Sequence, residues 1–472
     1  MAEMDGSKMP VTEQGGLPLD GLRQSLDVVD PVALLLTSTH LTGNRGLLRE
    51  EWRPDLSVGV VAGGYSSKTR DDIGRTCVAA LERVGDGWER ARPSYDLLER
   101  AVEWAMGAAL PRRPAGIIAR DGPAFHTAHW NHSIDLTGKR VGVIGTGASG
   151  MQMIPAIAEQ AAEVRVFART ATFLLPTPHL RHDLGEAEKW LLAELPHYRA
   201  WYRAVAFLPG IEGMLSAVTV DPTYPPTERA VSATSEQMRA ALQGWIDAQT
   251  EDDLHLRDAL TPRAPFGAKR WVADDGTWIT TLKRPDVHLV RDPIKEITES
   301  GVRCADDQLH ELDVLIYATG FHASEFLAPM QVTGRGAVDL QQHWAGDDAR
   351  AYLGSCVPGF PNFFCLYGPN TNVVVHGASL FFISECAVRY VVDAVRTMLE
   401  TGSSVIEVRE SVARAYDERL DEVSNQRAWA FSSVRSFYKN STGRSTLLWP
   451  FTAMELWQRT HRIDPADFLL HT

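Results

Sequence analysis

The chain has 472 residues, of which 44% are hydrophobic and 23% charged, and its formal net charge at pH 7 is -13. Since a domain usually holds on the order of 150 residues, this length predicts about two to four domains. The negative charge argues against nucleic acid or an anionic membrane surface as a partner.

The sequence shows no sign of export, membrane insertion or a metal centre. The N-terminus is polar and rich in glycine, unlike a signal peptide, and no apolar run is long enough to cross a bilayer. We therefore expect a cytoplasmic protein with reduced thiols and no bound metal, because its cysteines form neither a C-x-x-C pair nor a zinc pattern. The five cysteines are Cys77, Cys304, Cys356, Cys365 and Cys386.

Residues 1–110 predict an all-helical N-terminal domain. An Asp-Pro pair stands directly before the apolar run 32–36, which is typical of a helix with proline in its first turn. Residues 94–110 carry Leu, Val, Trp and Ala at helical spacing. Residues 111–136, which open with Pro-Arg-Arg-Pro-Ala-Gly, predict a linker.

A glycine-rich turn follows the linker and is the most informative part of the chain. A β-branched run from 139 leads to Gly145, Gly147 and Gly150, then to a helical stretch and to a second apolar run at 164–167. This strand–turn–helix–strand order is the context that a dinucleotide-binding fingerprint requires. Backbone N–H groups at the helix start would face the phosphates. The residues of the turn are Gly145, Thr146, Gly147, Ala148, Ser149 and Gly150.

The end of the second strand indicates which nucleotide is bound. An NAD site usually has Asp or Glu there, to accept hydrogen bonds from the ribose hydroxyls. This strand ends instead in Arg169 and Thr170. A guanidinium can pair with two oxygens of a 2′-phosphate, so NADPH is the expected cofactor. A solvated arginine at a strand end is the alternative interpretation.

The rest of the chain predicts an α/β fold. We expect a Rossmann-like NADP-binding domain at 137–325, with a helical insert at about 172–262 and further strands near 287–290 and 312–318. Residues 326–472 form the C-terminal region, with a helix expected near 384–399.

Further motifs stand in a fixed order around the glycine turn. They are Gly122-Pro-Ala-Phe-His126-Thr-Ala-His-Trp130, Gly267-Ala-Lys269-Arg270, Asp313-Val-Leu-Ile-Tyr-Ala-Thr319-Gly320-Phe321, Tyr367-Gly-Pro-Asn-Thr371 and Ser436-Phe437-Tyr438-Lys439-Asn440. Together these motifs resemble the Baeyer–Villiger monooxygenases, and more closely the 4-hydroxyacetophenone monooxygenase branch. Residues 34–43 resemble part of the helical N-terminal extension that is peculiar to that branch.

The resemblance implies an FAD enzyme that uses NADPH and O₂ to convert a ketone to an ester. It implies that the glycines of the turn bind the NADP pyrophosphate, and that Arg169, Thr170 and Lys269 bind its 2′-phosphate. Arg270 would be the catalytic arginine. The remaining positions carried over are His126 and Trp130 of the linker motif and the cofactor-binding group Thr319, Gly320 and Phe321. Taken singly, each has an ordinary structural alternative: a solvated Lys-Arg pair, a packed histidine, a strand end.

Members of that family carry two glycine fingerprints, and the first binds FAD. This sequence shows one, because residues 58–65 have the wrong glycine spacing. We therefore expect the FAD-binding Rossmann domain to be missing, and residues 326–472 to be the remainder of the FAD-type domain. Arg120 stands where the family pattern has an aromatic residue, and Phe437 stands where the family usually has tryptophan. Monooxygenation by this chain alone is then in doubt, since the flavin carries the oxygen chemistry.

Three functions remain open at this stage. The first is a monooxygenase that takes flavin into a remodelled cleft or from a partner subunit. The second is a flavin-free NADPH-dependent reductase, with Tyr438 or His126 as the proton donor. The third is a non-catalytic NADP-binding relic. The expected substrate is a small molecule, an aryl ketone by the branch resemblance. We expect the N-terminal helices and a homo-oligomer contact to cover the face that an FAD domain would occupy.

Overall fold

The computed structural model describes residues 122–471 with their side chains, except for 182, 203–213, 226, 374–380 and 431–433. For residues 59–62 and 380 it describes the backbone alone. The predicted helices at 31–36 and 94–110 and the first part of the linker lie outside the described residues. No helix of the described part is both long and apolar enough to cross a membrane.

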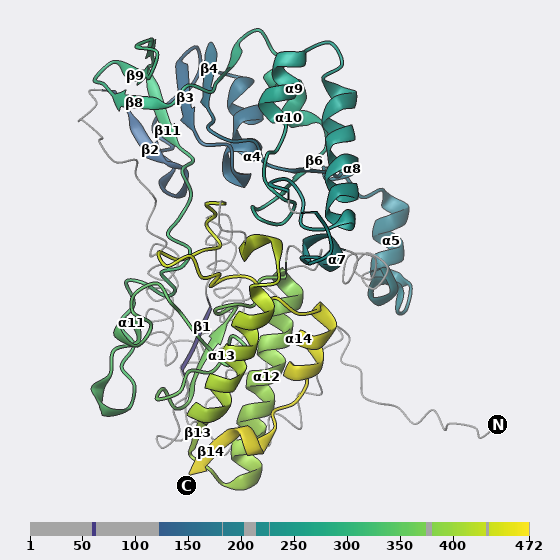
Figure 1. The fold of residues 1–472 in the computed structure, drawn as a ribbon, viewed down its shortest axis with the longest axis vertical. Coiled ribbons are helices and arrows are strands. Elements are labelled where there is room, and N and C mark those ends of the chain that lie inside the picture. The colour runs from purple at the N-terminus through teal and green to yellow at the C-terminus, as the bar shows by residue number, and fades with distance from the viewer. Residues whose placement is uncertain are drawn as a thin grey trace, which may run out of the picture.

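A parallel sheet of five strands forms the upper half of the molecule in Figure 1, in the order β2-β11-β3-β4-β7. Residues 141–144 and 314–317 of its inner strands are buried, apolar runs, which is typical of parallel sheets covered on both faces. The strands are β2 (Ala124–His126), β3 (Arg140–Ile144), β4 (Glu163–Phe167), β7 (Val287–Val290) and β11 (Val314–Tyr317). The predicted α/β class is confirmed.

All strands of this sheet run parallel, but the order in which successive strands are added to it reverses at β3. From β3 the chain proceeds through β4 to β7, whereas β11 returns to the opposite side of β3. In open α/β sheets a ligand binds outside the carboxyl ends of the strands at such a reversal. The topology therefore places a binding site beyond the ends of β3 and β11.

The two faces of the sheet have separate cores, because side chains alternate along each strand. Val141 and Val143 of β3 join the core that contains Ile154 and Trp278, whereas Ile144 joins the core on the other face. The first core lies under the helices α4 (Ala148–Ala158), α8 (Ala233–Gln249), α9 (Leu254–Leu260) and α10 (Thr277–Leu282). The second lies under a small antiparallel sheet of β8 (Ile294–Ile297), β9 (Gly301–Cys304) and β10 (Leu309–Glu311).

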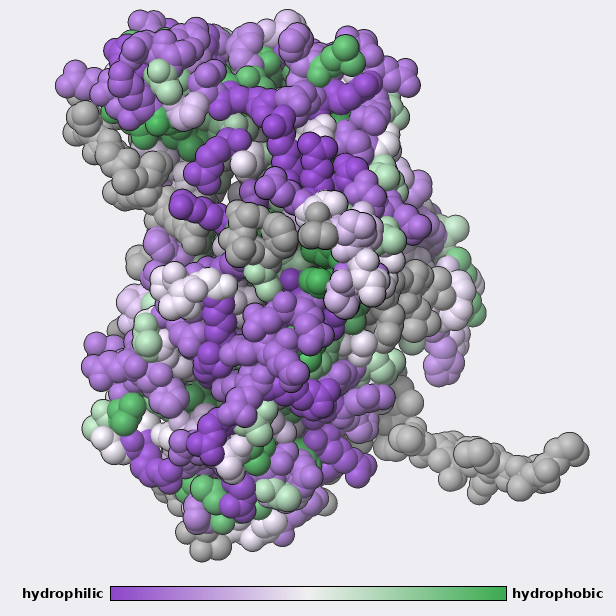
Figure 2. All heavy atoms as spheres, in the orientation of Figure 1, coloured by the Kyte–Doolittle hydropathy of each residue, from purple (hydrophilic) through white to green (hydrophobic). Residues whose placement is uncertain are grey.

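In its described residues, the segment between β4 and β7 contains a short parallel pair and five helices, of which α10 directly precedes β7. β5 (Leu174–Pro176) pairs with β6 (Val272–Asp274), and these strands enclose α5 (Glu186–Glu194), α7 (Leu215–Val218), α8 and α9. Ser232 and Asp253 accept hydrogen bonds from the first turns of α8 and α9, which fixes where these helices begin. The face of the molecule in Figure 2 is mostly hydrophilic. Large apolar side chains are exposed near α5, including Trp190 and Trp201.

The C-terminal region lies in the lower half of Figure 1. Its helices are α11 (Leu340–His343), α12 (Leu380–Thr401), α13 (Glu410–Ser424) and α14 (Ala453–Thr460), and its strands are β12 (Phe363–Leu366), β13 (Val405–Val408) and β14 (Phe468–His471). Short 3-10 turns lie at η3 (Thr127–His129), η4 (Arg335–Ala337), η6 (Ala428–Ala430) and η7 (Pro465–Asp467). β13 and β14 pair in antiparallel fashion.

One strand from the N-terminal part belongs to this lower half. β1 (Gly59–Ala62) runs parallel to β12, with Val60 beside Phe364. The prediction that residues 1–110 are all-helical does not hold for these four residues. Two successive β-branched residues favour an extended backbone, and β12 offers a partner strand far away in sequence.

A partly buried charged cluster joins α13 to the loops of this region. Arg350 and Arg444 each bond both Asp348 and Asp421, and we call these four residues the Arg350–Arg444 cluster. Asp417 lies beside it on α13. Burial raises the pKa of Asp417 to about 6, while the two arginines oppose the shift and the two aspartates add to it.

Replacing Asp417 should make stability less dependent on pH. Since the folded pKa lies above the ordinary value, ionised Asp417 destabilises the native state; this cost is absent below about pH 4 and complete above about pH 7. Asp417→Asn should therefore raise the free energy of unfolding by about 1–2 kcal/mol at pH 8 and leave it unchanged at pH 4. Urea unfolding at both pH values measures this. A stabilisation equal at both would contradict the assigned cause.

Candidate functional site

The turn between β3 and α4 has a geometry that only glycine allows at two positions. Gly145 has φ +110°, and a Cβ there would collide with the carbonyl oxygen of Ala318 at the end of β11. A Cβ on Gly150 would collide with the carbonyl oxygen of Gly145. These close approaches hold α4 against the ends of the two central strands.

The third glycine of the turn faces open space. Gly147 precedes α4 with φ -75°, and a Cβ built on it would meet no heavy atom within 4 Å. The first N–H groups of the eleven-residue helix α4 have no partner within the helix. An anion can therefore approach the backbone at Gly147 and accept hydrogen bonds from the helix start.

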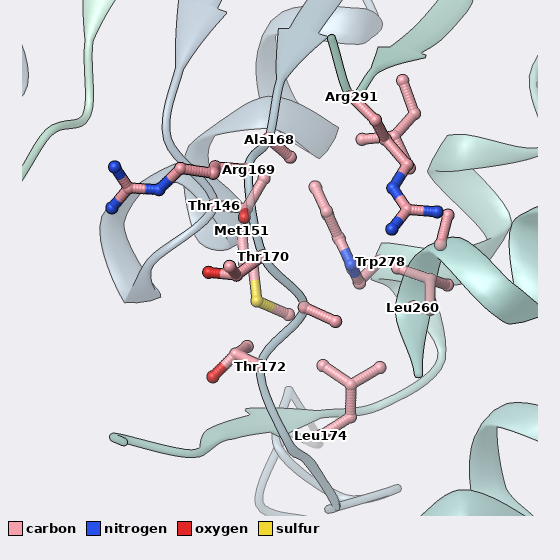
Figure 3. Close-up of a pocket in the computed structure, with 13 residues that line it drawn as sticks. Thr146, Met151, Ala168, Arg169, Thr170, Thr172, Leu174, Leu260, Trp278 and Arg291 are labelled. Carbon is pink, nitrogen blue, oxygen red and sulfur yellow. The ribbon is translucent and has the colours of Figure 1, made fainter. Parts of the chain in front are cut away.

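A pocket opens beside this turn, between the ends of β4 and β7 and the helices α9 and α10 (Figure 3). Trp278 and Arg291 stand on one side of it in the figure and Arg169 on the other. The lining residues are Thr146, Met151, Ala168, Arg169, Thr170, Ala171, Thr172, Leu174, Ala259, Leu260, Trp278, Leu289 and Arg291. The pocket thus combines apolar walls with basic and hydroxyl groups.

Two of the lining residues, Arg169 and Thr170, lie close to a second cation, Lys269, which is not itself part of the lining. Lys269 Nζ lies 3.3 Å from Thr170 Oγ1. Burial lowers the pKa of Lys269, and the nearby charge of Arg169 lowers it further. Neither cation has a carboxylate partner among the described residues, whereas Arg291 is paired with Asp258 at 2.9 Å. A crowded, uncompensated positive pair of this kind favours a bound dianion.

Arg270, which follows Lys269 in the chain, belongs to a second group of residues. The backbone oxygen of Arg270 accepts a hydrogen bond of 2.6 Å from Thr172, and its side chain is exposed. Its charge acts on Tyr438, whose ring is fully buried. Burial raises the pKa of the Tyr438 phenol far above its ordinary value, which Arg270 offsets in part, so Tyr438 stays protonated near neutral pH.

The linker motif lies beside the end of β11. His126 accepts a hydrogen bond from the Ala128 backbone, and its ring contacts Phe321 at 5.4 Å between centroids. Trp130 packs against Phe125. The structure thus brings the motifs together in three places: the glycine turn with residue 318, Arg169 with Thr170 and Lys269, and His126 with Phe321.

Sequence reasoning missed part of the pocket. Arg291 follows β7 directly, and a basic residue at the carboxyl end of a parallel strand is a signal that could have been used. Leu260 and Trp278 carry no comparable signal, because they belong to helices whose placement depends on the packing of the whole insert.

The comparisons with known proteins agree with this geometry. No family model matches the chain. A curated relative, the uncharacterized monooxygenase y4iD of Sinorhizobium fredii, is 33% identical over 77% of this chain and 55% of its own length. A Baeyer–Villiger monooxygenase of Streptomyces coelicolor is 29% identical over 75% of this chain and 65% of its own. The uncharacterized monooxygenase Mb0916 of Mycobacterium bovis is 30% identical over 86% of this chain and 79% of its own.

Solved structures give the same result for the fold. Oxidized steroid monooxygenase bound to NADP has a TM-score of 0.61 at 27% identity and matches 76% of this chain and 72% of its own. The OTEMO complex with FAD and NADP has a TM-score of 0.61 at 26% identity, over 77% and 74%.

The reversal in the sheet, the glycine turn and the cationic pocket define a dinucleotide-binding α/β protein. The matches just described place it more closely: the chain belongs to the family of flavin-dependent Baeyer–Villiger-type monooxygenases. It spans 55% of the S. fredii relative and 65% of the S. coelicolor enzyme, less than two thirds of either.

Two glycine substitutions should separate folding from ligand binding at the turn. Gly150→Ala forces a Cβ into a backbone carbonyl and should lower the free energy of unfolding by about 2–4 kcal/mol. Gly147→Ala meets no atom of the protein and should fold as well as the parent chain, yet lose at least about tenfold in NADP+ affinity by blocking the phosphate approach. Thermal unfolding and calorimetric titration measure both. Unchanged NADP+ binding by Gly147→Ala would contradict the assigned path of the phosphates.

Proposed function

We propose that this chain binds NADPH and is an oxidoreductase of the Baeyer–Villiger monooxygenase type. The observation that carries the proposal is the convergence of Arg169, Thr170 and Lys269 beside the glycine turn. The 2′-phosphate of NADPH supplies the dianion that this group lacks. NADPH brings a hydride when it is bound.

Each part of the cofactor has a set of residues to hold it. Gly145, Gly147 and Gly150 would hold the pyrophosphate, with Thr146 beside it and hydrogen bonds donated from the start of α4 at Ala148 and Ser149. The pocket of Figure 3 would hold the adenine, since Trp278 and Leu260 offer apolar contact and Arg291 a planar cation. The nicotinamide end would be held by Arg270, which we assign as the catalytic residue, and by the group Thr319, Gly320 and Phe321.

We further propose that the FAD-binding domain is missing and that the chain belongs to the 4-hydroxyacetophenone branch. The described residues contain one turn of the Gly145–Gly150 kind. The parallel pair of β1 and β12 is the start of such a unit, but of the three positions where the spacing would require glycine only Gly64 has one, and Ala62 and Ser67 occupy the other two. These residues do not fit a flavin site, so oxygenation by this chain alone is not part of the proposed function.

The proposed domain arrangement follows from this view. It comprises an N-terminal extension at 1–110, a linker at 111–136, the NADP-binding domain at 137–325 and a C-terminal region at 326–472. The substrate would be a small molecule of the aryl ketone class, and homo-oligomer formation would cover the C-terminal face.

A flavin-free NADPH-dependent reductase is the second candidate, and one observation favours it. Tyr438 is a buried, protonated phenol beside the positive charge of Arg270. A phenol so placed can donate a proton to a carbonyl oxygen while hydride arrives from the nicotinamide. In this case the chain would convert a ketone to an alcohol, consuming one NADPH without O₂.

Arg169→Ala tests the cofactor assignment. Losing charge-assisted bonds to the 2′-phosphate should lower NADPH affinity by about 10- to 100-fold and change NADH affinity little. Titration with each cofactor measures the ratio, and Arg181→Ala is the control, since this arginine is exposed, paired with Asp275 and not among the residues that line the pocket. Equal losses for NADPH and NADH would contradict the assignment.

The flavin proposal has a spectroscopic test. The purified chain should show no flavin absorbance and retain less than stoichiometric FAD after gel filtration. Direct reduction predicts NADPH consumption with an aryl ketone in the absence of O₂; the relic alternative predicts none. A yellow protein that NADPH bleaches would overturn the proposal that the FAD domain is missing.

A further inference from the structure

Residues 438–446 form a short hairpin that carries Tyr438 to its position. Tyr438 O accepts a hydrogen bond from Thr446 N at 3.1 Å, and the N–H of Asn440 donates to Arg444 O at 2.9 Å. Lys439 and Ser445 pair between them. The two strands are so short that the hairpin depends on anchors outside itself.

Arg444 is the main anchor. Its side chain is 12% exposed, and its guanidinium donates to Asp421 Oδ1 at 2.8 Å and to Asp348 Oδ1 at 3.2 Å. It also donates to Ala349 O at 3.3 Å and to Asn370 Oδ1 at 3.2 Å. One planar side chain therefore joins the hairpin to α13 and to two loops.

Two further contacts hold the tip of the hairpin to the same loop. Asn440 Nδ2 donates to Asp348 Oδ1 at 3.1 Å. The backbone N–H and the hydroxyl of Ser441 donate to Asp347 at 2.7 Å and 3.1 Å. The tip and the Arg444 side chain are thus fixed on one acidic loop, 347–348.

The cluster contains a matched arginine that does not touch the hairpin. Arg350 Nε lies 3.1 Å from Asp348 Oδ2, and its Nη1 lies 2.9 Å from Asp421 Oδ2. Both arginines share the same two carboxylates, but the side-chain bonds of Arg350 end there. Comparing the two separates an effect on the hairpin from an effect on the cluster.

We propose that Arg444 is a positioning residue that holds the 438–446 hairpin so that Tyr438 faces the nicotinamide end of the cofactor beside Arg270. The proposal rests on the NADPH site proposed above. Arg444 touches no part of that site itself. It acts through the hairpin, since Tyr438 lies two residues from the Asn440–Arg444 pair and would move with it. Tyr438 in turn belongs to the apolar core against which Trp271, the residue after Arg270, packs.

The test compares Arg444→Lys with Arg350→Lys, using NADP+ and 2′,5′-ADP, which lacks the nicotinamide half. Lysine keeps the charge but cannot serve four acceptors in one plane. Arg444→Lys should weaken NADP+ binding about three- to tenfold and leave 2′,5′-ADP binding unchanged. Arg350→Lys should change neither. Asp347→Ala, which frees the tip only, should act like Arg444→Lys at about two- to threefold and serves if Arg444→Lys does not fold.

A double-mutant cycle shows whether the effect passes through Tyr438. In a Tyr438→Phe background, Arg444→Lys should lose most of its effect on NADP+ affinity, because the phenol that it positions is gone. Equal losses for both ligands, or equal effects of the two arginine variants, would overturn the proposal and leave Arg444 a stabilising residue only. A parent chain that does not bind 2′,5′-ADP would instead refute the NADPH site and this proposal with it.

Discussion

The site depends on one close backbone approach, in which the turn after β3 lies against the end of β11. Gly145 and Gly150 leave no room for side chains there, and their contacts set where α4 begins and which way its N–H groups point. Because β3 and β11 adjoin at the reversal of the sheet, the same contact opens the space in which a dinucleotide can lie. A side chain at either position would separate the helix from the sheet and remove the phosphate site.

The charges around this turn distinguish binding groups from structural ones. Most basic side chains of the NADP-binding half are paired: Arg140 with Asp313, Arg284 with Asp286, Arg291 with Asp258. Arg169 and Lys269 are close to each other and have no such partner among the described residues. Two cations brought together without a counter-ion destabilise the protein slightly, and a phosphate relieves that cost when it binds. The selectivity for a phosphorylated nucleotide that we propose above would follow from this arrangement.

Much of the fold could be predicted from local patterns, and the rest could not because it depends on contacts between distant residues. The Gly145–Gly150 turn and the strands at 141–144 and 164–167 have short-range signals that the structure reproduces. The pairing of Gly59–Ala62 with β12 joins segments about three hundred residues apart, and no local rule predicts it. Similarly, Leu260 and Trp278 enter the pocket, and Arg444 meets Asp348, only through the packing of whole helices and loops.

On the function proposed above, this family member retains an NADPH site whether or not it works with flavin. A crystal structure of the chain with NADP+ tests this most directly. The account predicts density for the pyrophosphate over Gly147 and for the 2′-phosphate within hydrogen-bonding distance of Arg169, Thr170 and Lys269. An NADP+ bound elsewhere, or a 2′-phosphate pointing to solvent away from these three residues, would contradict it.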